Sequence, residues 1–191
     1  WKALAKDTSI PFEVWYLSHH GVNPSFDSGF GKRFAWDVDL LSGYHSRLLS
    51  NGVVELPDGF MGLRLNKDFA LLLKEKKVTA LWVQGWNVMA YWQAIWQANA
   101  AGIPVWLRGE SNDLAPVLYW KVTIKRLLLG QLFKRVDKIL YIGKANKRLY
   151  ESYNVPSNIF YPGPYCVENL RFAREAETLL PKRADIRKTW N

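Results

Sequence analysis

The sequence predicts an α/β fold: a Rossmann-like, doubly wound and mostly parallel sheet in a single domain. Short apolar segments rich in strand-forming residues alternate with segments of helical composition along most of the chain. The chain has 191 residues, of which 49% are hydrophobic, so it can bury a sizeable core and is not a disordered protein.

The segment 79–113 predicts a βαβ unit, in which 79–83 and 105–107 are short apolar strands. Asn87 is expected to cap the intervening helix and Gly102 to end it in the left-handed conformation. Strands joined in this way are parallel, with a right-handed crossover, and ligands bind beyond their carboxyl ends. The side chains expected there are those of Trp86, Asn87, Arg108, Glu110 and Ser111.

The residues before this unit predict a less regular region. We expect a strand at 12–17, a long Gly-rich polar loop at 19–32 and a helix at 67–76 that begins after Asn66. The segment 36–51 is compatible with a helix and equally with a turn followed by a strand.

The residues after the unit continue the alternation. We expect a helix at 116–136, a strand at 138–142, a helix at 145–153 that ends near Asn154, and a short strand at 159–161.

Cysteine and histidine are scarce. Cys166 is the single cysteine, so no internal disulfide is possible, and a reducing, cytoplasmic compartment is the simpler interpretation. One cysteine and three histidines also argue against a structural zinc site, and we expect no metal. No apolar run reaches the roughly 18 residues of a membrane span, and no signal peptide opens the chain.

Positive charge is concentrated in the second part of the chain. Residues 1–120 contain equal numbers of basic and acidic residues, so the net charge of +9 comes from 121–191. Such a basic region is typical of contact with an anionic membrane surface, a phosphorylated acceptor or nucleic acid. The alternative is a solvated positive face without a dedicated partner. The residues expected to contact a membrane or an anion are Lys121, Lys125, Arg126, Lys134 and Arg135.

Several common functional motifs are absent. The sequence contains no P-loop, no G-x-G-x-x-G after a strand, no H-E-x-x-H and no paired-cysteine metal signature. Dinucleotide binding and P-loop hydrolysis are therefore unsupported, although the fold class is compatible with both.

A series of spaced motifs resembles one family. The segment 27–44, DSGFGKRFAWDVDLLSGY, resembles the D-x-G-F-G and W-D-x-x-L-L-x-G-Y pattern of a branch of the retaining GT-B glycosyltransferases, glycosyltransferase family 4. The order continues with Gly85-Trp86, with LRGES at 107–111 and with Ile142-Gly143 followed by Asn146. It ends with PYCVEN at 164–169 and then Phe172, which resembles the P-Y-x-V-[DE]-N-x-x-F segment of the family.

The resemblance implies that residues 1–172 are the N-terminal, acceptor-side domain of such an enzyme. The first strand and the C-terminal domain that binds the nucleotide-sugar donor would be missing, with 173–191 as a charged tail or the start of a linker. The chain alone would then hold no cofactor and be inactive. The complete enzyme would transfer a sugar, with retention, to a glycan or lipid-linked acceptor in polysaccharide biosynthesis. A peripheral location at the inner membrane face is one expectation for such an enzyme.

The resemblance also suggests roles for the residues at the strand ends. Asp27 would bind or orient an acceptor hydroxyl, Trp86 would stack on a sugar, and Asn87 would donate hydrogen bonds. Arg108 would pair with an anionic group and Glu110 would hold a hydroxyl, with Ser111 beside them. Many family members have a histidine where this chain has Gly85-Trp86-Asn87, and we assign no catalytic residue.

Structural roles are the alternative for these residues. Trp86 would pack against Trp82 or Trp92, and Arg108 and Glu110 would pair with a neighbouring loop. Two other functions also stay open: a non-enzymatic carbohydrate-binding or scaffold domain, and a nucleic-acid-binding module, which is disfavoured because no nucleic-acid motif is present. A second α/β domain in the full-length protein would favour the enzyme, whereas salt-dependent binding of DNA or RNA would favour the last.

Overall fold

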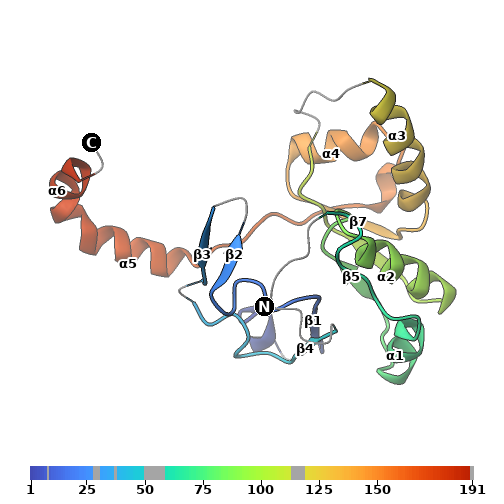
Figure 1. The fold of residues 1–191 in the computed structure, drawn as a ribbon, viewed down its shortest axis with the longest axis horizontal. Helices are drawn as coiled ribbons and strands as arrows, with labels where there is room; N and C mark the ends of the chain where they lie inside the picture. The colour runs from blue at the N-terminus through green and yellow to red at the C-terminus, as the bar shows by residue number, and fades with distance from the viewer. Residues whose placement is uncertain (8, 28–30, 37, 50–58, 113–118, 190–191) are drawn as a thin grey trace.

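The computed structural model describes residues 1–7, 9–27, 31–36, 38–49, 59–112 and 119–189. Its centre is a four-stranded parallel sheet in the chain order β5-β6-β7-β8 (Figure 1). The strands are β5 (Leu81–Val83), β6 (Val105–Leu107), β7 (Lys138–Tyr141) and β8 (Phe160–Pro162). The helices α2 (Met89–Ala100), α3 (Tyr119–Phe133) and α4 (Lys144–Glu151) connect them. The predicted Rossmann-like α/β fold is confirmed.

One face of this sheet carries the hydrophobic core. Val83, Val105, Leu107 and Ile139 are buried on neighbouring strands, whereas the alternating residue Trp106 is only partly buried. The helices complete the core with buried apolar residues, including Ile95, Ala98, Leu129, Leu132, Phe133 and Tyr150.

The predicted βαβ unit is confirmed, but the expected N-cap is wrong. Gly102 follows α2 with a φ of 72°, as expected for the residue that ends the helix. The N-cap residue is Val88 instead of Asn87, and no side chain caps the helix. Backbone carbonyls from a loop much earlier in the chain accept from the first amides of the helix instead. The amide of Met89 donates to Phe60 O at 2.7 Å, and that of Ala90 donates to Leu63 O at 3.0 Å.

The helix α1 (Phe69–Glu75) also begins without the expected cap. Its N-cap residue is Asp68, and Asn66 contributes only its backbone carbonyl. The side chain of Gln97 on α2 accepts from the amide of Ala70 at 3.0 Å and donates to Asn66 O at 3.0 Å. One amide side chain therefore joins the two helices and satisfies the helix start.

The N-terminal region forms two small sheets. After a 3-10 turn at Leu4–Lys6, β1 (Val14–Tyr16) pairs in parallel with β4 (Ser46–Leu48), so the segment 36–51 contains the turn and strand. The hairpin of β2 (Ser25–Asp27) and β3 (Lys32–Phe34) lies where a loop was predicted. The prediction of a loop was wrong because these strands have three residues each and lack a clear apolar alternation.

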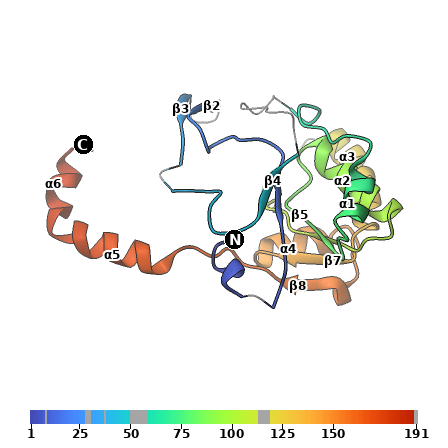
Figure 2. The same cartoon turned by 90° about the horizontal axis from the view of Figure 1, so that it is seen from below.

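The C-terminal residues are helical and extend away from the sheet (Figures 1 and 2). A 3-10 turn at Ser157–Ile159 precedes β8, and α5 (Asn169–Leu179), a 3-10 turn at Leu180–Lys182 and α6 (Arg183–Lys188) follow it. The predicted domain boundary at residue 172 lies within α5. Among the residues with a described structure, no helix has the length and apolarity needed to cross a membrane.

Candidate functional site

The four parallel strands end at one edge of the sheet, where polar side chains and glycines follow each strand. Asn87 comes after β5, Arg108, Glu110 and Ser111 come after β6, Gly143 comes after β7, and the loop 163–168 comes after β8. Because carboxyl ends of parallel strands form the usual ligand edge of such sheets, this edge is the candidate site.

Trp86 lies beneath this edge and not on its surface. Its side chain is 8% exposed, and its ring packs edge-on against Phe133 and Tyr150, with centroid distances of 5.5 and 5.8 Å. Its carbonyl accepts from Trp92 Nε1 at 2.9 Å. The expectation that Trp86 stacks on a sugar is corrected, because neighbouring core side chains enclose the ring.

Gly109 allows the Trp86 ring to lie directly against the loop after β6. A Cβ atom at Gly109 would lie 2.0 Å from Cζ3 and 2.5 Å from Cη2 of Trp86. The absence of a side chain at Gly109 therefore fixes how closely the loop approaches the core. The residue Asn87, next to Trp86 in the chain, is exposed.

Asn146 ties the loops after β6 and β7 together. Its side chain is 3% exposed, and its Nδ2 group donates to Gly109 O at 3.1 Å and to Ser111 O at 2.6 Å. Its Oδ1 atom accepts from the amide of Ile142 at 3.1 Å. The predicted residue Ser111 thus has a structural role through its carbonyl. The sequence motifs include Asn146, but they did not predict any role for its side chain.

Arg108, Glu110 and Tyr165 form a cluster above the edge. The Arg108 Cζ atom lies 4.2 Å from the centroid of the Tyr165 ring, and the Tyr165 hydroxyl donates to Glu110 Oε1. Arg108 and Glu110 follow β6, whereas Tyr165 follows β8, 55 residues after Glu110. The expectation that Glu110 pairs with a neighbouring loop is therefore confirmed, and its partner is Tyr165. The sequence did not predict that Tyr165 belongs to this site.

The charge of Glu110 acts on Tyr165 and also on Tyr91 of α2. Burial, followed by the hydrogen bond and the charge of Glu110, raises the pKa of Tyr165, while the charge of Arg108 acts to lower it. Burial, followed by the charge of Glu110, also raises the pKa of Tyr91 on α2. Both phenols are therefore protonated hydrogen-bond donors at neutral pH.

Asp27 lies in the β2–β3 hairpin, where it is paired in register with Lys32. The position of its side chain is outside the described part of the structure, so its role with an acceptor stays a prediction. In the described part, no group of three or more His, Cys, Asp and Glu side chains is placed to hold a metal ion.

The predicted basic residues of α3 and of the turn after it are exposed where they are described. Lys125, Arg126, Lys134 and Arg135 are all exposed, and the side chain of Lys121 is outside the described part. Arg126 also has a structural role, because its Nη2 donates to Ser152 O at 2.6 Å and its Cζ lies 5.9 Å from the Tyr153 ring.

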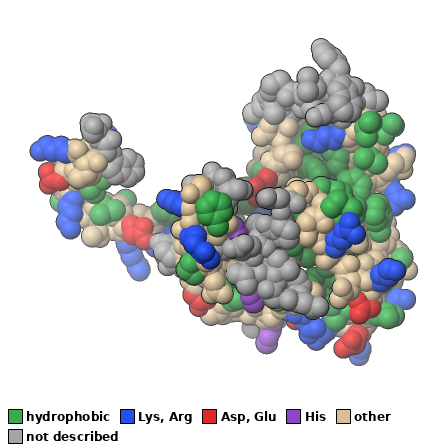
Figure 3. Space-filling view, viewed as in Figure 1, with side chains coloured by type: hydrophobic (Ala, Val, Ile, Leu, Met, Phe, Trp, Pro, Cys, Tyr) green, Lys and Arg blue, Asp and Glu red, His purple; other side chains and the backbone are tan. Residues whose placement is uncertain are grey.

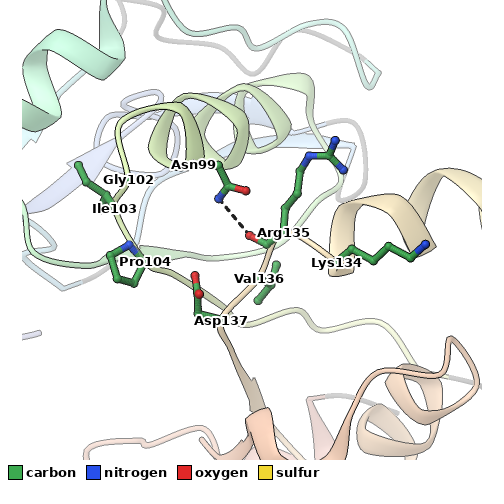
Figure 4. Close-up of a pocket in the computed structure, with 8 residues that line it drawn as sticks. All are labelled: Asn99, Gly102, Ile103, Pro104, Lys134, Arg135, Val136 and Asp137. Carbon is green, nitrogen blue, oxygen red and sulfur yellow. Dashed lines mark hydrogen bonds between the residues drawn. The ribbon is translucent and has the colours of Figure 1, made fainter.

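A shallow cavity of about 290 Å³ lies at the opposite, amino edge of the sheet (Figure 4). Its polar groups already bond to one another: Asn99 Nδ2 donates to Arg135 O at 3.1 Å, and the amide of Val105 donates to Asp137 Oδ2 at 2.8 Å. The cavity therefore lies between the turn before β6 and the turn before β7, and it is separate from the Arg108 cluster. The residues that line it are Asn99, Gly102, Ile103, Pro104, Lys134, Arg135, Val136 and Asp137.

Comparison of the sequence with models of known protein families found no match, and comparison with curated proteins found none either. The function is therefore inferred from the residues at the carboxyl edge and from the motifs that they belong to.

Proposed function

We propose that this chain is the acceptor-binding half of a retaining glycosyltransferase, which requires a further, donor-binding domain for transfer. The observation that carries the proposal is the cluster of Arg108, Glu110 and Tyr165, which brings together charged and polar side chains from two separate loops. Their placement beyond the carboxyl ends of parallel strands suits a small polar ligand. The spaced motifs that resemble glycosyltransferase family 4 support a sugar acceptor as that ligand.

A transfer assay tests this proposal directly. The full-length protein, including the expected donor domain, is incubated with a panel of nucleotide-sugars and with glycan and lipid-linked acceptors. The proposal predicts a glycosylated product whose anomeric configuration is that of the donor. Binding of sugars without transfer would favour a carbohydrate-binding or scaffold domain. Steeply salt-dependent binding of DNA or RNA, with no response to sugars, would favour a nucleic-acid-binding module.

We also propose that the protein works as a peripheral protein at the cytoplasmic, anionic face of a membrane. Three large aliphatic side chains on α3 support this: Ile124, Leu127 and Leu128 are 55%, 67% and 54% exposed. Their spacing of three and four residues places them on one face of the helix. Figure 3 shows hydrophobic side chains, with Lys and Arg among them, over the part of the molecule where α3 lies.

The charges around these residues favour a lipid surface as the partner. Residues 114–136 contain five basic residues and no acidic one. A helix that exposes aliphatic residues beside lysine and arginine is suited to the interface of an anionic bilayer, where each basic residue contributes about 1 kcal/mol. Sedimentation with phosphatidylglycerol vesicles tests this, and equal binding to phosphatidylcholine vesicles would argue against it.

A further inference from the structure

Two nitrogen atoms of Arg108 have no hydrogen-bond acceptor among the residues that the structure describes. Its Nε and Nη2 atoms are shielded from solvent and make no hydrogen bond there. A guanidinium is always charged, and enclosing its N–H groups without an acceptor is unfavourable. The arrangement is therefore incomplete and would be completed by an acceptor that a ligand supplies.

The ring of Tyr165 lies against this guanidinium. Its ring lies 4.2 Å from Arg108 Cζ, yet 54% of the residue is exposed. Tyr165 belongs to the loop between the end of β8 at Pro162 and the start of α5 at Asn169. Its side chain can therefore move away without disrupting a helix or a strand. A two-bonded pair between arginine and an anion also satisfies N–H groups that a cation–π contact leaves without an acceptor.

Glu110 adds a second requirement for the ligand. Its carboxylate accepts a hydrogen bond from the Tyr165 hydroxyl, and an ionised carboxylate can only accept. If Tyr165 moves away, Glu110 needs a hydroxyl donor in its place. Arg108 and Glu110 both contact Tyr165, so their side chains lie on the same side of the loop after β6.

We infer that the cluster binds an anionic sugar, with a carboxylate or phosphate on Arg108 and a sugar hydroxyl on Glu110, in the place that Tyr165 occupies. The inference rests on the proposed function, because it specifies the acceptor of that site as a uronic acid or a sugar phosphate. Tyr165 makes comparable contacts: its ring lies against the guanidinium and its hydroxyl donates to Glu110. The ligand completes the hydrogen bonding of Arg108, which Tyr165 leaves unsatisfied.

Binding by NMR titration of the ¹⁵N-labelled protein tests this inference without a nucleotide-sugar donor. Glucuronate, glucose 6-phosphate, glucose and inorganic phosphate are added separately at constant pH and ionic strength. We expect glucuronate or glucose 6-phosphate to shift the amide signals of Gly109, Glu110 and Tyr165. Glucose and inorganic phosphate should each bind at least about tenfold more weakly, because each lacks one of the two contacts.

Variants identify the contacts. Arg108→Gln should weaken binding of the anionic sugar at least about tenfold, whereas Lys125→Gln, which changes an exposed cation on α3, should not. Tyr165→Ala should strengthen binding because the competing cover is removed, and Tyr165→Phe should have a smaller effect in the same direction. Glucose binding as tightly as glucuronate, or unchanged binding in a folded Arg108→Gln variant, would overturn the inference.

The test separates this inference from the proposed function. Selective binding of an anionic sugar supports the inference even if the full-length protein transfers nothing. Transfer to a neutral acceptor, without preference for an anionic one, would support the enzyme and overturn the inference about its acceptor.

Discussion

The side chain of Asn146 holds the carbonyl of Ser111 at 2.6 Å, joining the first turn of α4 to the loop after β6. The same Nδ2 group reaches Gly109 O, and Oδ1 accepts from the amide of Ile142. One buried amide therefore fixes two neighbouring loops of the candidate site. The position of Arg108 and Glu110 relative to the sheet depends on this contact.

Replacing Asn146 should destabilise the protein. Asn146→Ala leaves two carbonyls and one amide without their buried partner, so the free energy of unfolding should fall by about 1–3 kcal/mol. Asn99→Ala is a matched control, because the side chain of that exposed asparagine makes one hydrogen bond among the described residues, to Arg135 O, and its loss should change stability by less than about 1 kcal/mol. Urea denaturation of the two variants measures the difference. Equal losses would contradict the role given to Asn146.

Glycine at 109 should not tolerate a methyl group. Gly109→Ala places a Cβ about where the Trp86 ring lies, and the resulting displacement should cost about 1–3 kcal/mol of stability. Gly130→Ala, within α3, meets nothing within 4 Å and should instead stabilise the helix by about 0.5–1 kcal/mol. Thermal unfolding of both variants checks the opposite signs. A stable Gly109→Ala protein with an unchanged Trp86 environment would contradict this packing.

Tyr150 should make stability depend on pH in the alkaline range. The side chain is fully buried beside Asn146 and Gly109, and burial raises its pKa. The folded protein therefore holds this proton more tightly than the unfolded chain does. The corresponding stability is complete below the unfolded pKa of about 10 and is lost as the pH rises toward the folded value.

Tyr150→Phe tests that linkage. Between about pH 9 and pH 11 the free energy of unfolding should fall in the unmodified protein and should fall less steeply in the variant. The two slopes should differ by up to about 1.4 kcal/mol per pH unit. Urea denaturation at a series of pH values measures both slopes. Identical slopes would show that Tyr150 is not responsible.

The exposed aliphatic face of α3 should contribute to membrane binding more than an equally exposed leucine elsewhere. Leu127→Ser should lower binding to phosphatidylglycerol vesicles by about tenfold, since a buried leucine contributes about 1.5–3 kcal/mol. Leu71 on α1 is 68% exposed, compared with 67% for Leu127, so Leu71→Ser is a matched control. Sedimentation of both variants should separate them. If both bind as the unmodified protein does, α3 is not the contact surface.

The regular elements could be predicted because their signals are local. Apolar strand segments, the uninterrupted helical composition between them and the left-handed Gly102 are all properties of short segments. The caps could not be predicted in this way, because the start of α2 depends on the carbonyls of Phe60 and Leu63, and that of α1 on Gln97. Tertiary contacts replaced the local side-chain caps.

The candidate site was predicted only in part, for a related reason. The position of Arg108 and Glu110 after a strand follows from the sequence, but whether Trp86 points into the core or into the site depends on its packing with Phe133 and Tyr150. Tyr165 reaches Glu110 across 55 residues, a contact that periodicity does not reveal. The only signal for Tyr165 and Asn146 was their presence in the spaced motifs.

The central claim is that Arg108 and Glu110 bind the acceptor of a glycosyl transfer. The most direct measurement is the KM for the acceptor and for the nucleotide-sugar in the full-length protein, with Arg108→Ala and Glu110→Ala as variants. We expect each variant to raise the acceptor KM at least about tenfold and to leave the nucleotide-sugar KM unchanged, because the lost contacts are charge-assisted hydrogen bonds to the acceptor alone. An unchanged acceptor KM in both variants would contradict the claim.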